Sequence, residues 1–105
     1  MSGKTRKQQL EELLELDPND SFVRYGLAME HAGSGDDTQA AKLLEELMRR
    51  DPNYVPAYLQ AGRALMRLGD DDRAREVLHR GVAVARRVGD DHAAGEMAGF
   101  IESLG

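Results

Sequence analysis

The stretch Leu10-Glu11-Glu12-Leu13 returns further along the chain as Leu44-Glu45-Glu46-Leu47, and Asp17-Pro18-Asn19 returns at the same interval as Asp51-Pro52-Asn53. Over the thirteen residues that end with these asparagines, seven positions are identical between the two copies. Position 10 recurs at 44 and position 17 at 51, which is a period of 34. A fixed period of this length with helical patterning is typical of stacked helix pairs, in which each pair buries its apolar face against the next. The sequence therefore predicts an all-α repeat fold, whose function resides in a surface rather than in a reaction centre.

Proline and glycine mark the ends of the predicted helices. Pro18 and Pro52 each follow an aspartate, at points where one helix must stop and the next begin. The tripeptide Gly-Asp-Asp occurs at 35–37, 69–71 and 89–91, where its glycine is suited to end one helix and its aspartate to cap the next. The third copy follows the second at a shorter interval than the repeat period and marks a different junction. These signals predict six helices and no strand, the helices spanning about residues 4–16, 20–32, 37–50, 54–68, 71–88 and 91–104.

The composition of the chain indicates the cellular compartment in which we expect the protein. The chain has no cysteine, so disulfides and thiolate metal sites are excluded. Its first nine residues contain no apolar run of the kind found in secretory signals, and no stretch approaches the roughly 20 apolar residues that span a bilayer. We therefore expect a soluble cytoplasmic protein that does not associate with a membrane.

The charge balance disfavours a nucleic-acid partner. The net charge is −5, whereas non-specific binding to nucleic acid depends mainly on cations that neutralise phosphates. Eleven of the fourteen basic residues are arginines, which favours a bacterial source with a GC-rich genome.

The sequence shows no pattern of catalytic or metal-binding residues. His31, His79 and His92 are far apart, and none belongs to a His-Glu-x-x-His arrangement. The acidic triplet at 70–72 lacks the alternating oxygen ligands of a calcium loop, so helix capping explains it better. There is no Gly-x-Ser-x-Gly and no phosphate-binding glycine loop. We expect no enzymatic activity, no metal and no cofactor.

The spacing within each repeat unit resembles the tetratricopeptide repeat, with its pattern aromatic-x2-Leu-Gly-x2-Tyr, then Ala-x3-Phe, then Pro. In the second unit the matching residues are Tyr58, Ala61, Gly62, Leu65, Ala74 and Leu78. In the first unit we match them to Phe22, Tyr25, Gly26, Met29, Ala40, Leu44 and Pro52. The small residues of this pattern, and Gly81 with them, are expected where paired helices approach closely.

This alignment of the two units requires an offset. Phe22 comes four residues after Pro18, whereas Tyr58 comes six residues after Pro52. We expect the loop at residues 33–35 to restore the two missing residues, so that the period of 34 survives.

The resemblance implies a right-handed superhelical stack of antiparallel helix pairs in a single domain, residues 1–105. Its divisions would be a leading half repeat at 4–18, a first repeat at 19–52, a second repeat at 53–88 and a capping helix at 89–105. The last helix carries an apolar stripe of the spacing that a capping helix needs, formed by Met97, Phe100, Ile101 and Leu104.

Proteins of this family usually bind an extended peptide or a partner helix in a concave groove lined by the first helix of each pair. Carried over to this sequence, the groove residues would be Val23, Leu27, Glu30, His31, Leu59, Gln60, Arg63, Met66 and Arg67. Arg63 and Arg67 are one helical turn apart and would point into the same space. With an apolar strip beside two arginines, the groove would suit an amphipathic, partly acidic peptide.

Two other functions remain open from the sequence. The apolar stripe of the last helix and the incomplete leading unit favour a structural role, in which the chain self-associates or extends a larger assembly. RNA binding is the other, because pentatricopeptide repeats are also helix pairs and read one base each. The acidic charge argues against it. We expect an adaptor with a protein or peptide partner, as a monomer or a weak homodimer.

Overall fold

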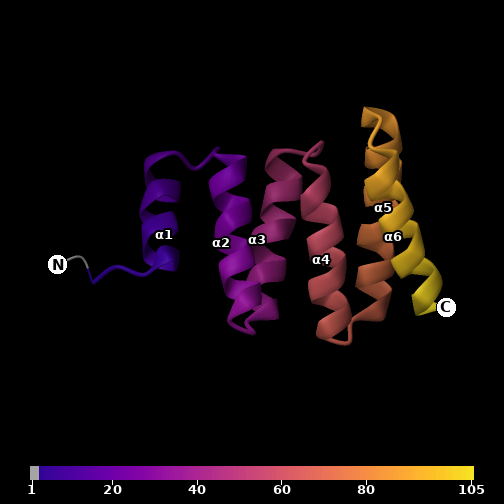
Figure 1. Ribbon diagram of the computed structural model, residues 1–105, viewed down its shortest axis with the longest axis horizontal. Helices are drawn as coiled ribbons and strands as arrows, with labels where there is room; N and C mark the ends of the chain where they lie inside the picture. The colour runs from indigo at the N-terminus through magenta and orange to yellow at the C-terminus, as the bar shows by residue number, and fades with distance from the viewer. Residues whose placement is uncertain (1–2) are drawn as a thin grey trace.

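A computed structural model describes residues 3–105 and shows six helices joined by short turns (Figure 1). In chain order they are α1 (Arg6–Leu16), α2 (Ser21–Gly33), α3 (Asp37–Arg50), α4 (Val55–Arg67), α5 (Asp71–Val88) and α6 (Asp91–Leu104). Each helix packs against its neighbours in the chain, and α4 also contacts α6. Residues 3–105 contain no strand. The predicted all-α repeat stack is confirmed, with helix ends within two residues of expectation.

Each Gly-Asp-Asp lies at the junction between two consecutive helices and supplies the caps of both. Gly35 and Gly69 have φ of 85° and 79°, the left-handed conformation that glycine adopts without strain. The backbone N–H of Asp36 then donates to the carbonyl of His31 (2.9 Å), while its side chain accepts from the N–H of Gln39 (3.1 Å). One aspartate therefore completes the C-cap of α2 and forms the N-cap of α3, and Asp70 does the same between α4 and α5.

The third copy of Gly-Asp-Asp occupies a different kind of junction, as predicted. Asp-Pro-Asn separates α1 from α2 and α3 from α4, whereas Gly89 and Asp90 separate α5 from α6. Helix α5 has 18 residues and α3 has 14, so α5 continues past the point where α3 ends. Asp90 again caps both helices, since its N–H donates to Ala85 and its side chain accepts from Ala93.

The two repeats align in an unbroken register, without the expected offset. Helices α2 and α4 both have 13 residues and begin at positions 21 and 55. The counterpart of Tyr58 is therefore Arg24, and both side chains donate to the carbonyl of the preceding proline: Arg24 Nη2 to Pro18 (2.7 Å) and the Tyr58 hydroxyl to Pro52 (2.8 Å). The alignment of Phe22 with Tyr58 was wrong. Tyr58 is 2% exposed, whereas Phe22 is 74% exposed.

The core runs along the stack between the helices. Its largest fully buried side chains are Tyr58, Leu44, Leu47, Leu65, Leu78 and Met97. The stripe on α6 packs as predicted, because Met97 belongs to this core and Phe100, Ile101 and Leu104 pack against it. A smaller cluster of Leu10, Val23 and Leu27 joins α1 to α2.

Small residues allow the helices to approach closely at two of the expected glycines. A Cβ at Gly62 would lie 2.6 Å from Cγ of Leu78, and one at Gly81 would lie 2.6 Å from Cβ of Tyr58. Ala40 and Ala74 are also completely buried. Gly26 differs from this expectation, since a Cβ there would meet only Leu10 at an ordinary 3.7 Å.

We predict opposite effects for the same substitution at different glycines. Gly62→Ala and Gly81→Ala should each lower the free energy of unfolding by about 1–3 kcal/mol, because the added methyl forces neighbouring helices apart. Gly99→Ala in α6, where nothing lies within 4 Å of the new Cβ, should raise it by about 0.5–1 kcal/mol through helix propensity. Urea unfolding of the three variants measures this. Equal shifts at all three positions would contradict the close-approach argument.

Candidate binding face on helices α2, α4 and α6

The alternate helices α2, α4 and α6 carry side chains that point away from the stack. Residues seven apart lie on the same side of a helix, so Phe22 and Met29 share one side of α2. That side is open because Val23 and Leu27 face α1 while Tyr25 faces Tyr54, which immediately precedes α4. The corresponding residues of α4 and α6 complete a surface that we call the binding face: Phe22, Met29, Leu59, Gln60, Arg63, Met66, Arg67 and Phe100.

A hollow of about 250 Å³ lies at the α4–α6 side of the binding face, lined by Arg63, Met66, Arg67 and Phe100. The Arg63 guanidinium carbon is 5.8 Å from the centre of the Phe100 ring, a cation–π distance. A second hollow of about 400 Å³ lies on the other side of Phe100, along Glu96, Gly99 and Ser103. Apolar space and a positive charge therefore adjoin at one aromatic ring.

The two arginines of the face have different surroundings. Arg67 pairs with Asp37 at the start of α3, with its Nε at 3.0 Å and its Nη2 at 2.9 Å from the same carboxylate oxygen. The Asp37 side chain is only 15% exposed, so this pair links α4 to α3 as well as lining the hollow. Arg63 is exposed and rests on Phe100. A carboxylate from a ligand can therefore reach Arg63 without displacing an ion pair.

The four groove residues expected on α2 do not line the face. Val23 and Leu27 are 8% and 4% exposed and pack on Leu10 of α1. Glu30 lies beside α1, with its carboxylate 3.6 Å from Nε of Arg6, and the His31 side chain is 12% exposed with Nδ1 3.8 Å from Asp36. These positions were derived with the two-residue offset that the structure lacks. Without it, Tyr25, Gly26 and Met29 are the counterparts of Leu59, Gln60 and Arg63.

The residues expected on α4 all belong to the binding face as defined above, together with three residues that the sequence analysis did not assign to the groove. Leu59, Gln60 and Met66 are half-buried, while Arg63 and Arg67 are exposed. The three residues not assigned to the groove are Phe22, Met29 and Phe100. The i, i+7 spacing of Phe22 and Met29, read with an unbroken repeat period, could have found the first two.

Two tyrosines pack together between α2 and α4, beside the binding face. The rings of Tyr25 and Tyr54 are 5.6 Å apart at an interplanar angle of 50°. Burial raises the pKa of Tyr25 above its usual value, against smaller opposing effects of a hydrogen bond with Gln60 and of the Arg63 charge. Burial also raises the pKa of Tyr54, and the neighbouring Tyr25 and Asp51 add to this increase. Both phenols therefore favour the neutral form in the folded protein.

This pair predicts a loss of stability at alkaline pH. Because the pKa of each tyrosine is higher in the folded state, its contribution is complete below about pH 10 and declines as pH rises through the folded pKa. The free energy of unfolding of wild type should therefore fall more steeply above about pH 10 than that of Tyr54→Phe. Urea unfolding at a series of alkaline pH values tests this. Identical slopes for the two proteins would refute it.

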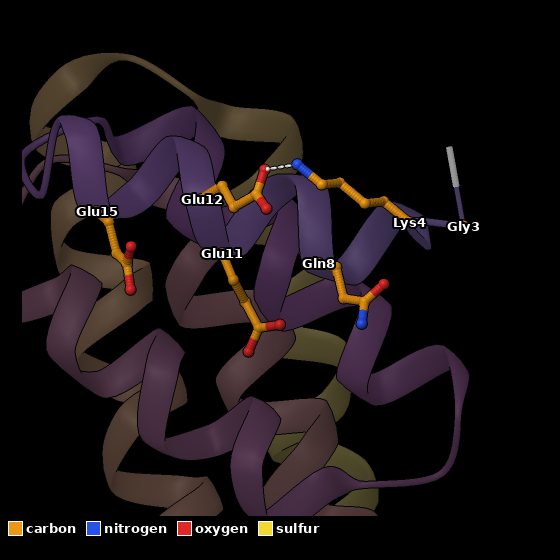
Figure 2. A pocket seen from close by; sticks show the side chains of 6 residues that line it. All are labelled: Gly3, Lys4, Gln8, Glu11, Glu12 and Glu15. Atoms are coloured by element: carbon orange, nitrogen blue, oxygen red, sulfur yellow. Dashed lines mark hydrogen bonds and ion pairs between the residues drawn. The ribbon is translucent and has the colours of Figure 1, made fainter. Parts of the chain in front are cut away.

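Another hollow lies on the outer side of α1, with a volume of about 590 Å³ (Figure 2). Its side chains are Lys4, Gln8, Glu11, Glu12 and Glu15, and the Lys4 ammonium is 2.8 Å from the Glu12 carboxylate. Both members of this pair are more than half exposed, so it contributes little to stability. Among residues 3–105 no group of three or more His, Cys, Asp or Glu side chains is placed to hold a metal ion.

Comparisons with known proteins agree with this architecture. A family model described as tetratricopeptide repeat matches residues 31–95. A TPR repeat-containing protein of Pseudomonas aeruginosa is 32% identical over 95 residues, which are 90% of each chain. The chain belongs to the tetratricopeptide repeat family. The resemblance inferred from the sequence is thereby confirmed.

Solved structures of other proteins match most of the chain. The solution structure of a tetratricopeptide repeat domain protein from Salinibacter ruber has a TM-score of 0.78 and 35% identity, covering 84% of this chain and 89% of that one. The crystal structure of PcrH, in complex with the chaperone binding region of PopD, has a TM-score of 0.88 over 93% of this chain and 74% of that one. At 21% identity, this second match shows a shared fold. No helix within the described part of this tetratricopeptide chain is long and apolar enough to cross a membrane.

Proposed function

We propose that this tetratricopeptide domain is an adaptor whose binding face takes a peptide or a helix of a partner protein. Family membership supports a role in protein–protein interaction. The observation that supports this face is an aromatic side chain at each end, the exposed Phe22 on α2 and the half-buried Phe100 on α6, with Arg63 between them. PcrH, which has the same fold, binds a region of PopD, so a stack of this kind is able to hold a segment of another protein.

The chemistry of the face specifies the kind of segment. Phe22 and Met29 offer apolar contact on α2, and Met66 with Phe100 offers a hollow that fits an apolar side chain. Arg63 supplies a planar cation that binds carboxylates with two parallel hydrogen bonds. The preferred ligand is therefore amphipathic and partly acidic, as the sequence predicted, although the apolar residues on α2 are different ones.

The size of the face limits the affinity. Three helices contribute to it, so the buried area should stay below about 1,200 Å², the range of weak or transient complexes. We expect a dissociation constant on the order of micromolar, which corresponds to about −8 kcal/mol.

We also propose that the domain is divided as the sequence indicates. A leading half repeat would span residues 4–18, two repeats would span 19–52 and 53–88, and a capping helix would span 89–105.

Charge reversal at Arg63 tests the proposal. A pull-down from source lysate would compare wild type with Arg63→Glu, with Arg86→Glu on α5 as the matched control outside the binding face. We expect a partner retained by wild type and Arg86→Glu, and retained about tenfold less by Arg63→Glu, as loss of a charged hydrogen bond predicts. Arg67 is unsuitable for this purpose, because its reversal would also break the ion pair with Asp37.

A second variant tests the apolar end of the face. Phe22→Ala should reduce retention of the same partner while changing the free energy of unfolding by less than about 0.5 kcal/mol, because the side chain is 74% exposed. Thermal unfolding provides the stability control for both variants. Equal retention by wild type, Arg63→Glu and Phe22→Ala would show that the partner binds elsewhere.

A further inference from the structure

Helix α1 has the sequence of an interior helix but only one covered side. Leu10-Glu11-Glu12-Leu13 repeats Leu44-Glu45-Glu46-Leu47 of α3, which packs between α2 and α4. Leu47 is 1% exposed, whereas its counterpart Leu13 is 49% exposed. Leu16, three residues further on the same flank, is 83% exposed. The difference arises because α1 packs on α2 alone, as α3 packs on α4, and within residues 3–105 no helix covers the other side of α1 as α2 covers that of α3.

Helix α6 is the converse case at the other end of the stack. When the first residues of α4 and α6 are aligned, Ala98 takes the position of Gly62. Gly62 is where Leu78 of the following helix packs, but within residues 3–105 no further helix follows to cover residue 98, which is only half-buried. Gly95, one turn earlier on the same flank, is exposed, and a Cβ there would meet nothing within 4 Å. The uncovered flank of α6 is therefore made of small residues.

We infer that these two flanks bind each other between copies of the chain: Leu13 and Leu16 of one copy pack on Gly95 and Ala98 of the next. Helix α6 of one copy would then be followed in the series by α1 of the next, as α4 is followed by α5. This self-association goes beyond the proposed adaptor function and uses different residues from the binding face.

The packing inside the chain favours this pairing over contact between two α1 helices. At three places a bulky side chain lies over a glycine of another helix: Leu78 over Gly62, Met97 over Gly81 and Leu10 over Gly26. Two α1 flanks would instead place leucine against leucine, with no small residue to receive either side chain. They would also bring together two helices that each expose Glu11, Glu12 and Glu15 (Figure 2).

The symmetry of the contact determines what is observed. The two flanks differ, so the interface is heterologous and joins copies in an open series instead of closing as a dimer. Each joint contains few side chains and falls in the size range of weak contacts, so it forms at high protein concentration. The mass of the wild-type protein should therefore rise with concentration, beyond that of two chains.

Blocking one end at a time tests this inference. The first variant, Leu13→Glu with Leu16→Glu, blocks α1, and the second, Gly95→Lys, blocks α6 where a side chain has free space. Each alone should remain monomeric up to about 1 mM, a concentration that detects contacts as weak as about −4 kcal/mol. A mixture of the two should form a one-to-one dimer, because each variant retains the flank that the other lacks. Sedimentation equilibrium measures all three samples.

Matched controls separate the contact from general effects. Leu68→Glu changes a leucine that is 45% exposed at the end of α4, outside both flanks, so this variant should associate like wild type. Circular dichroism checks folding, and Leu16→Glu alone replaces the double variant if that one unfolds. A wild-type monomer at about 1 mM would overturn the inference. So would a dimer of the Gly95→Lys variant alone, which would indicate contact between two α1 helices.

Discussion

Where α4 meets α5, Leu78 lies over Gly62 so closely that a Cβ on the glycine would be 2.6 Å from its Cγ. This contact fixes the distance between the two helices, and Met97 over Gly81 does the same between α5 and α6. Since α4 also packs on α6, these two contacts together determine how far apart the outer sides of α4 and α6 lie. The hollow between Met66 and Phe100 exists because the helices beneath it are held at that spacing.

The turns between helices keep the orientation of successive helices regular along the chain. Asp36, Asp70 and Asp90 each close one helix with a backbone N–H and start the next with a carboxylate, so one residue is bonded to both helix ends. Such turns leave the helices little freedom to rotate about their axes. Helices α2 and α4 therefore repeat with the same orientation from one unit to the next, which aligns Met29 with Arg63 on one face.

The arginines of this chain differ in their contacts: some are bonded to groups within the fold, and one is available to a ligand. Arg24 donates to the carbonyl of Pro18, where burial lowers its pKa, and Arg67 holds Asp37. Arg73 of α5 likewise pairs with Glu45 of α3. Arg63 stands apart because its neighbour is an aromatic ring, which leaves its guanidinium able to exchange that contact for a carboxylate. Family resemblance alone does not distinguish these roles.

The sequence by itself determined the number and the ends of the helices, the repeat period and the family, because these depend on local signals. A glycine with positive φ and an aspartate N-cap act within a few residues, wherever the helix packs. Only the tertiary structure decided which side of α2 faces outward. Each residue turns a helix by about 100°, so an alignment error of two residues rotates the inferred face by about 200°. That error put the buried Val23 and Leu27 in place of the half-buried Tyr25 and Met29, whose orientation depends on how α2 packs against α1 and α3.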